Sequence, residues 1–329
     1  MPIPLWLDCD PGHDDAIAIL LAAHSPQIDL LGVSTVHGNQ SSDKTFRNAC
    51  RMLTVAGVAG RVKAYRGADK PLAREARHDP EIHGESGLEG SPTLDAFPPA
   101  PDVAGEGKAI MAMAAAIQAS SQPVALVATG ALTNVALLLS VFPEVKSNIA
   151  QVAIMGGAMG IGNRHPVAEF NILTDPEACR ILFESGLPVT MVPLEVTHTA
   201  LATESVLERA RRPRGQESPF GQVVLDLLTF FKTTYKTVFG FEHPPVHDPC
   251  AIAYILDPSL FEAPLMRVDV VTGEHFTAGQ TVCDVWGESK LPKNVRVTTK
   301  MDVEGFWKLV LEALGRCDAV TPLNRGSKL

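Results

Sequence analysis

The sequence alternates short apolar segments rich in β-branched residues with segments whose apolar residues recur at helical spacing. The segments predicted to be strands span residues 3–8, 28–36, 124–129, 149–155 and 189–193. The segments predicted to be helices span residues 14–24, 45–56, 132–140 and 176–185. Strands that are apolar on both faces and are joined by helices form parallel sheets covered by helices on both sides. We therefore predict an α/β fold, a single domain over residues 1–329 with a mostly parallel, doubly wound, Rossmann-like central sheet.

Two segments interrupt this alternation. Residues 71–101 are rich in proline, glycine and acidic side chains, and we expect them to form a mobile loop beside the functional site. Residues 204–241 carry apolar side chains at helical spacing, among them Leu228, Phe231 and Tyr235. We expect a helical insertion there.

The charge of the chain bears on its partners, and its apolar runs and termini bear on its location. A formal net charge of −9 argues against a nucleic-acid partner, because binding to phosphate backbones depends on clustered Lys and Arg. The apolar runs are too short to cross a membrane, and Met1 leads almost directly into the first predicted strand, so we expect a cytoplasmic protein. The terminal Ser327-Lys328-Leu329 matches a peroxisomal signal, which matters if the host is eukaryotic.

A dense group of carboxylates follows the first predicted strand. Asp8, Asp10, Asp14 and Asp15 lie on a strand, a Pro-Gly turn and the start of a helix. Ligands of open α/β sheets bind at the carboxyl ends of the strands, where this group falls. Clustered carboxylates repel one another unless a cation or protons neutralise them, and oxygen ligands alone favour calcium or magnesium. The alternative is that Asp14 and Asp15 only complement the dipole of their helix.

Two later groups of polar residues are further candidates. His247 and Asp248 precede an apolar helix predicted at 250–256, where the alternative is an ordinary helix cap. Asn163, Glu169 and Asn171 follow the strand that ends in Met155-Gly156-Gly157. Their mixture of donors and acceptors suits sugar hydroxyls, although a polar loop without function is the alternative.

Together these motifs resemble the inosine–uridine-preferring nucleoside hydrolase family, and the likeness covers nearly the whole chain. The motif D-x-D-P-G-x-D-D at residues 8–15 is the most specific part of it. His13, at a variable position of that motif, is not expected to be catalytic. The supporting motifs, in chain order, are HGN at 37–39, HGESGL at 83–88, TGALTN at 129–134, MGG at 155–157, AEFN at 168–171, DPEA at 175–178 and HDPC at 247–250.

The resemblance implies a calcium-dependent N-ribohydrolase, which uses water to split a ribonucleoside into base and ribose. Asp10, Asp15, Asp248 and the backbone carbonyl of Thr129 are implied to hold Ca²⁺. Asp10 is implied to be the base that takes a proton from the water, and Asn39 to help position that water.

The resemblance also assigns contacts to the ribose. Asp14 is implied to bind the 2′-hydroxyl, Asn171 the 3′-hydroxyl, and Asn163 with Glu169 the 5′-hydroxyl. Met155 is implied to pack under the sugar. Family likeness further suggests a homo-oligomer, either a tetramer or a dimer.

The residues that contact the base follow less directly. In relatives that act on purines, the histidine matched by His247 protonates the departing base. The candidates for the base pocket are His83 and the aromatic residues Phe231, Tyr235 and Phe239, for which core packing is the alternative. The HGESGL and AEFN motifs look most like those of members that prefer uridine and cytidine. Purine and nicotinamide ribosides stay open as alternatives.

Two other classes of protein share part of this pattern. One carries an Asp-x-Asp pair after its first strand, and the other carries an acidic calcium site. A magnesium-dependent phosphatase would need a nucleophilic Asp8 and a later phosphate-binding Lys, and the Pro-Gly turn followed by two more aspartates does not fit it. A non-catalytic calcium-dependent binding protein would not need the complete set of Asp10, Asp14, Asn171 and His247.

Overall fold

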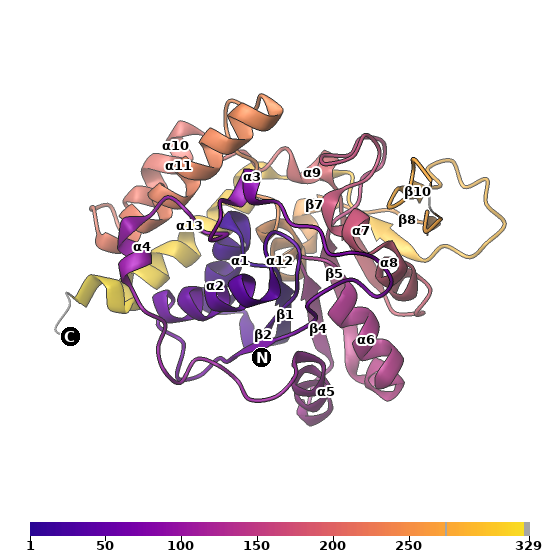
Figure 1. Cartoon of the computed structure of the whole chain (residues 1–329), viewed down its shortest axis with the longest axis horizontal. Helices are drawn as coiled ribbons and strands as arrows, with labels where there is room; N and C mark the ends of the chain where they lie inside the picture. The colour runs from indigo at the N-terminus through magenta and orange to yellow at the C-terminus, as the bar shows by residue number, and fades with distance from the viewer. Residues whose placement is uncertain (274, 326–329) are drawn as a thin grey trace.

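A mostly parallel sheet of eight strands runs through the centre of the molecule (Figure 1). The computed structural model describes residues 1–273 and 275–325, so the terminal Ser327-Lys328-Leu329 lies outside the described residues. All neighbours in the sheet are parallel except β8, which runs antiparallel to β11 at one edge. In spatial order the strands are β3 (Ala64–Arg66), β2 (Ile28–Thr35), β1 (Ile3–Cys9), β4 (Val124–Ala128), β5 (Ile149–Met155), β6 (Val189–Val192), β11 (Val295–Val297) and β8 (Leu265–Met266).

Helices cover both faces of this sheet. One apolar core lies under α1 (His13–His24), α2 (Ser42–Val55), α12 (Pro249–Leu256) and α13 (Val303–Val320). A second core, on the opposite face, lies under α5 (Ala109–Ala119), α6 (Thr133–Val141) and α8 (Pro176–Phe183). Figure 1 shows the two groups of helices on either side of the sheet. The predicted single α/β domain with a doubly wound sheet is confirmed.

The order of the strands creates a crevice. From β1 the chain winds outward through β2 and β3, and then returns to β4 beside β1 before continuing to β5 and β6. At such a reversal the connections leave the carboxyl ends of the two central strands in opposite directions, so the space between them stays open to a ligand. Asp8 lies near the end of β1 and Asp10 directly after it, and Thr129 directly follows β4.

The two segments that interrupt the alternation contain helices. Residues 204–241 form α10 (Glu204–Arg211) and α11 (Pro219–Phe239), and a short loop joins the two helices. Residues 71–101 contain the short helices α3 (Pro80–His83) and α4 (Pro92–Ala96), and α3 packs against α11. The mobility of this segment stays a prediction.

The last third of the chain contains short strands that the sequence pattern did not reveal. Besides β8 and β11, two small antiparallel sheets pair β9 (Val268–Val270) with β10 (Thr281–Cys283) and β7 (Phe261–Glu262) with β12 (Lys300–Met301). The remaining short helices are α7 (Phe170–Thr174), α9 (Leu194–Thr197), η1 (Pro143–Asn148), η2 (Pro258–Leu260) and η3 (Pro322–Arg325). Among the described residues, no helix combines the length and the hydropathy needed to cross a bilayer.

A buried tryptophan fixes the position of the first strand. The pairing of β1 with β2 shifts register between Leu5 and Trp6, so that Trp6 lies opposite Gly32. The Trp6 ring is 1% exposed, and its Nε1 donates to Ser34 Oγ at 2.9 Å. Ser34 Oγ in turn donates to Asp8 Oδ1 at 2.5 Å. Packing at Gly32 is therefore linked to the start of the acidic group.

We expect Gly32→Ala to lower the free energy of unfolding by about 1–3 kcal/mol, because the added methyl group must displace a buried ring. A Cβ at position 32 would lie 2.6 Å from Cζ3 of Trp6. Thermal unfolding measures the effect. The matched control is Gly60→Ala, whose Cβ would have no neighbour within 4 Å. Equal melting temperatures for the two variants would contradict this account of the register.

Candidate active site

Carboxylates gather at the crevice between β1 and β4. Pro11 and Gly12 turn the chain from β1 into α1, whose first turn carries Asp14 and Asp15. Asp248 lies at the start of α12 and brings a third carboxylate to the same place. Carboxylate oxygens of Asp14, Asp15 and Asp248 lie within 4.8 Å of one another, and all three residues are buried.

Asp15 and Asp10 are held in place by hydrogen bonds. Asp15 Oδ2 accepts from the Gly12 N–H at 3.0 Å and from Asn39 Nδ2 at 3.2 Å, while its Oδ1 accepts from Thr129 Oγ1 at 2.8 Å. Asp10 Oδ2 accepts from the Asn39 N–H at 2.7 Å. Asp10 Oδ1 is buried and has no hydrogen-bond partner among the described residues. One oxygen of Asp10 is thus fixed and the other is available.

Two glycines allow the backbone to approach Asp10. A Cβ at Gly38 would lie 2.1 Å from Asp10 Oδ2, and a Cβ at Gly130 would lie 2.6 Å from Asp10 Oδ1. Any larger residue at either position would clash with the carboxylate. The HGN and TGALTN motifs therefore need their glycines for the same reason, which is to enclose Asp10.

Burial changes the acidity of this group. Removal from water raises the pKa of Asp14 to about 8, with a further contribution from the charge of Asp15. Burial also raises the pKa of Asp10, Asp15 and Asp248 above their ordinary values. Ionisation of these carboxylates is therefore unfavourable in the folded chain unless a cation compensates their charge.

The side of the cavity opposite α1 is built around α7. Glu169 caps this helix, accepting from the Gly157 N–H at 2.9 Å and the Asn171 N–H at 2.8 Å. Asn171 Nδ2 donates to the carbonyl of Thr129 at 2.8 Å and to that of Met155 at 3.1 Å. Because both amide hydrogens are used, Asn171 presents its oxygen as an acceptor. Burial raises the pKa of Glu169 to about 7, against hydrogen bonds from backbone N–H groups that lower it.

Uncharged rings form another part of the wall. Tyr235 Oη lies 2.7 Å from His247 Nε2, and His247 Nδ1 lies 2.8 Å from Thr197 Oγ1. The rings of Phe231 and Tyr235 meet edge to face, with centroids 4.6 Å apart. Burial lowers the pKa of His247 and His83 well below their ordinary value, so both imidazoles are neutral.

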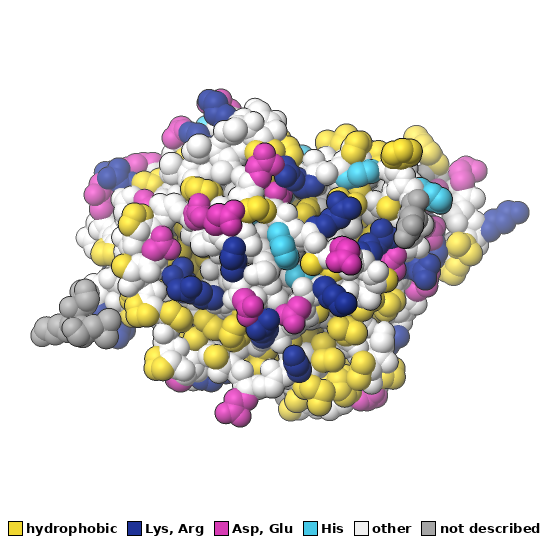
Figure 2. Space-filling model, viewed as in Figure 1, with side chains coloured by type: hydrophobic (Ala, Val, Ile, Leu, Met, Phe, Trp, Pro, Cys, Tyr) yellow, Lys and Arg dark blue, Asp and Glu magenta, His cyan; other side chains and the backbone are white. Residues whose placement is uncertain are grey.

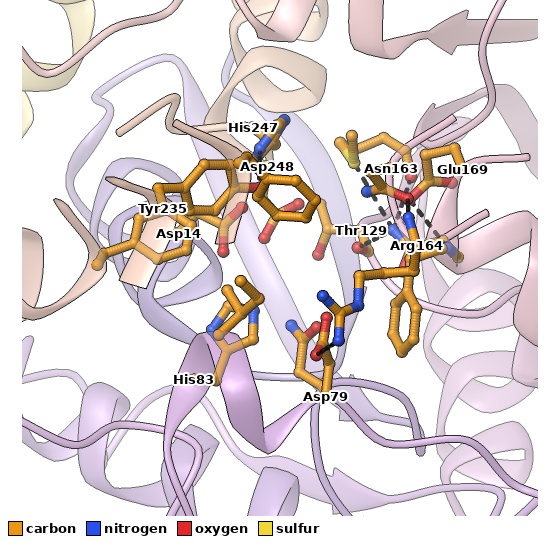
Figure 3. Close-up of a pocket in the computed structure, with 17 residues that line it drawn as sticks. Asp14, Asp79, His83, Thr129, Asn163, Arg164, Glu169, Tyr235, His247 and Asp248 are labelled. Atoms are coloured by element: carbon orange, nitrogen blue, oxygen red, sulfur yellow. Dashed lines mark hydrogen bonds and ion pairs between the residues drawn. The ribbon is translucent and has the colours of Figure 1, made fainter. Parts of the chain in front are cut away.

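These groups surround one cavity that contains about 450 Å³ of empty space, including its mouth. Figure 3 shows Asp14, Tyr235, His247 and Asp248 along one side, His83 and Asp79 below them, and Asn163 and Glu169 on the far side. Of the residues predicted for the site, all but Asp10 and Asp15 line the cavity. Those that line it are Asp14, Asn39, His83, Thr129, Met155, Asn163, Glu169, Asn171, Tyr235, His247 and Asp248. Asp10 and Asp15 are joined to it through Asn39.

The aromatic residues proposed for the base pocket both pack in a core and line the cavity. Phe231 and Tyr235 form a small core cluster with Ile82, and they also line the cavity together with Phe239. Packing and contact with a ligand are therefore not exclusive for these side chains.

Sequence reasoning missed four lining residues, namely Asp79, Ile82, Arg164 and Phe170. Arg164 Nη2 lies 2.6 Å from Glu81 Oε2 and 3.1 Å from Asp79 Oδ1, and its guanidinium lies 5.9 Å from the centroid of the Phe239 ring. Arg164 follows Asn163 directly, and Phe170 lies inside the AEFN motif. Their positions next to predicted site residues could have indicated that they line the cavity.

One face of the molecule carries charges of both signs. On the face seen in Figure 2, Lys and Arg side chains are interspersed with Asp and Glu side chains. Arg164, which lines the cavity, forms ion pairs with Asp79 and Glu81.

The chain matches the family described as inosine-uridine preferring nucleoside hydrolase over residues 5–308. It belongs to this family. The chain is 44% identical over 325 residues to a probable ribonucleoside hydrolase of Dictyostelium discoideum, covering 96% of this chain and 95% of that protein. It is 46% identical over 317 residues to the pyrimidine-specific ribonucleoside hydrolase RihA of Shewanella woodyi, covering 95% of this chain and 98% of that protein. A purine-preferring ribonucleoside hydrolase from Gardnerella vaginalis superposes with a TM-score of 0.88 at 30% identity, covering 97% of this chain and 100% of that one.

In this nucleoside hydrolase, several motif residues support the site from outside the cavity. Thr133 Oγ1 donates to Asp175 Oδ2 at 2.6 Å and lies 3.1 Å from His37 Nε2. Asn134 Nδ2 donates to Asp8 Oδ1 at 2.8 Å. Burial raises the pKa of Asp8 to about 7. The residues of the TGALTN motif thus connect three strand ends beneath the acidic group.

We expect the chelator-treated nucleoside hydrolase to lose stability as the pH rises from about 5 to about 8. Buried Asp14 and Glu169 have folded-state pKa values of about 8 and about 7, above their ordinary values. The native state therefore binds more protons than the unfolded chain in this range, so raising the pH favours unfolding. Melting temperatures across this range measure the effect.

Asp14→Asn should weaken this pH dependence, because it removes one titrating group from the buried cluster. Glu288→Gln makes the same change of charge at an exposed position and should leave the slope unchanged. A melting temperature that rises steadily with pH would show that the carboxylates ionise freely in the fold.

Proposed function

We propose that this nucleoside hydrolase depends on Ca²⁺, held by Asp10, Asp15, Asp248 and the backbone carbonyl of Thr129. The observation that carries the proposal is the buried acidic group itself, whose members keep raised pKa values without a cation. Asp10 Oδ1 is a buried oxygen without a hydrogen-bond partner among the described residues, so it is available to bind a cation. Carboxylate and carbonyl oxygens are the donors that Ca²⁺ prefers.

The grouping of oxygens also bears on the ribose. Asp14, proposed to bind the 2′-hydroxyl, shares its group with the proposed ligands Asp15 and Asp248. A hydroxyl that donates a hydrogen bond to Asp14 would therefore lie next to the cation site. When bound, the cation supplies positive charge that binds sugar hydroxyls and makes a water molecule easier to deprotonate.

Asp10 is the proposed general base. Its Oδ2 is fixed by the Asn39 N–H, and Oδ1, the oxygen also proposed to hold the cation, has a second lone pair that can take the proton of the attacking water. Asn39 Nδ2 donates to the carbonyl of Asp10 at 3.1 Å and to Asp15, which ties the base to the acidic group. Asn39 lines the cavity and is placed to position the water.

The ribose is proposed to lie between Asp14 and α7. Cleavage of an N-glycosidic bond builds positive charge on the sugar, as in other glycoside hydrolysis. Asp14, Asp248 and Glu169 surround that position with carboxylates. The oxygen of Asn171 accepts from the 3′-hydroxyl, Asn163 with Glu169 binds the 5′-hydroxyl, and Met155 packs under the ring.

The base is proposed to be uracil or cytosine, facing His83, Phe231, Tyr235 and Phe239. The support is the similarity to the pyrimidine-specific RihA of Shewanella woodyi, together with the aromatic side chains that line the cavity. The purine-preferring relative of known structure keeps a purine riboside as the alternative. His247 is the proposed source of a proton for the departing base: its imidazole would take up a proton from water before cleavage, pass one through Tyr235 Oη, 2.7 Å from His247 Nε2, and return to its neutral form.

We also propose that the enzyme is a homo-oligomer, a dimer or a tetramer. Apolar side chains are exposed on the β9–β10 hairpin and the loop after it, where Phe276 is 96% exposed and Trp286 is 89% exposed. Figure 1 shows this region projecting from the edge of the molecule. Exposed apolar groups of this kind are typical of protein–protein contacts.

We expect Ca²⁺ to raise the melting temperature of the metal-stripped protein and Asp248→Asn to abolish that rise. A ligand that binds only the native state adds about 2.7 kcal/mol of stability at a hundredfold excess over its Kd. Calorimetric titration of Ca²⁺ into the folded protein measures the same binding directly. Glu288→Gln, which removes an exposed carboxylate, should bind Ca²⁺ as the unaltered protein does. Undiminished binding by Asp248→Asn would remove that residue from the ligand set.

We expect the enzyme to release ribose from uridine, and Asp10→Asn to lower kcat by about 10²–10⁴-fold through loss of the base. Turnover of 2′-deoxyuridine should be very slow, because the substrate lacks the hydroxyl that Asp14 binds. A reducing-sugar assay measures both, and release of phosphate from phosphate esters is the parallel test for a phosphatase. Equal rates on uridine and 2′-deoxyuridine would rule out the proposed ribose contacts. A protein that binds Ca²⁺ and releases no ribose from any ribonucleoside would be a binding protein.

A further inference from the structure

His13 occupies a variable position of the first motif, yet its side chain is completely buried against the site. Its ring stacks on His83, Phe230 and Phe231, with centroid separations of 5.4, 5.1 and 5.5 Å. A buried imidazole must satisfy its nitrogen atoms with hydrogen bonds, because an unpaired polar group is costly away from water. The partners of its two nitrogens therefore decide its chemical state.

One nitrogen of His13 faces a carbonyl and the other faces a second imidazole. Nε2 lies 2.9 Å from the carbonyl oxygen of Glu89, and Nδ1 lies 3.2 Å from Nδ1 of His83. A carbonyl can only accept, so Nε2 of His13 carries the hydrogen. A neutral imidazole has a single N–H, which leaves Nδ1 of His13 as an acceptor. His83 must then donate from its own Nδ1.

The backbone N–H of His13 points at the same atom, His83 Nδ1, at 3.3 Å. Donation along this line would leave two lone pairs facing each other across the 3.2 Å between the rings. Donation from ring to ring removes that repulsion over the shorter of the two distances, and it leaves the backbone N–H of His13 without an acceptor at His83 Nδ1. The backbone N–H lies in the first turn of α1, where such groups have no acceptor within the helix.

We propose that His13 is a positioning residue that holds His83 as the Nδ1–H tautomer, so that Nε2 of His83 is a hydrogen-bond acceptor at the base end of the cavity. His83 lines the cavity, and no hydrogen bond reaches its Nε2 from the described residues. Figure 3 shows the His83 ring extending from α3 toward the open space. The inference rests on the proposed function, because it assigns the ligand of Nε2 as an N–H group of the leaving base.

The proposal predicts a preference among bases. Uracil carries a ring N–H and cytosine an exocyclic amino group, so each offers a donor to a bare imidazole nitrogen. A base whose donor is replaced by a methyl group loses that hydrogen bond. N3-methyluridine is such an analogue of uridine, with the ribose unchanged.

A crossed pair of substitutions separates hydrogen bonding from packing. His13→Phe keeps a ring against Phe230 and Phe231 and removes the acceptor. His13→Asn removes the ring and keeps an acceptor close to the position of Nδ1. We expect His13→Phe to raise KM for uridine by about three- to tenfold, the effect of one neutral hydrogen bond, with a smaller change in kcat. His13→Asn should recover part of this loss, and a purely structural role would give the reverse order.

Discrimination between uridine and N3-methyluridine is the second readout. The unaltered enzyme should favour uridine, and His13→Phe should lose most of that preference. Because the ratio compares two substrates on one enzyme, a change in the amount of folded protein does not affect it. An unchanged ratio in His13→Phe would overturn the assignment of the base contact.

Nitrogen NMR of the imidazole rings tests the tautomer without any substrate, with the His83 signals assigned by comparison with His83→Gln. We expect protonated Nδ1 and bare Nε2 in the unaltered protein. A protonated Nε2 on His83 would overturn the proposal even if the enzyme hydrolyses uridine. Correct tautomers in a protein that releases no ribose would instead overturn the proposed function.

Discussion

The mutual repulsion of buried carboxylates is the constraint on which the site depends. Asp10, Asp14, Asp15 and Asp248 are all removed from water between two strand ends and two helix starts. Ionising several carboxylates in one buried volume is unfavourable without a compensating charge, so the fold keeps them together at a cost to its own stability. The surrounding structure supplies what is needed to hold them, including the N–H groups that bind Asp10 and Asp15 and the glycines that let the backbone close around Asp10.

The sheet positions this group because its strand order reverses there. β1 and β4 are neighbours in space and far apart in sequence, so Asp10 and Thr129 meet only when the doubly wound topology is complete. Beneath them, Trp6, Ser34 and Asp8 form a chain of hydrogen bonds inside the sheet. Packing in the core of β1 is thereby connected to the orientation of its last residues, which lead into the acidic group.

The sequence specified the elements near the site well and the contacts between distant loops poorly. Strand β1 and helix α1 were predictable because apolar periodicity and a Pro-Gly turn are local signals. The lining residues Asp79 and Arg164 were not, since their ion pair joins loops that are distant in sequence. The short strand β11 has three residues, too few for a periodic pattern, and becomes a strand only by pairing with β6. His13 illustrates the same limit, because its role depends on meeting His83 across the fold.

The distribution of charge within the cavity follows the course of the proposed reaction. Carboxylates surround the place of the ribose, which becomes positive as the N-glycosidic bond breaks, whereas the base end is lined by neutral imidazoles and aromatic rings. The departing base gains electron density in the same step. A carboxylate facing it would oppose the cleavage, and a neutral ring that forms a hydrogen bond does not. Burial favours the uncharged form of both kinds of group. It therefore raises the pKa of the carboxyl groups and lowers the pKa of the histidines. Ionisation of the acidic end therefore requires a compensating charge, which the proposed cation would supply, while the histidines are kept neutral by burial.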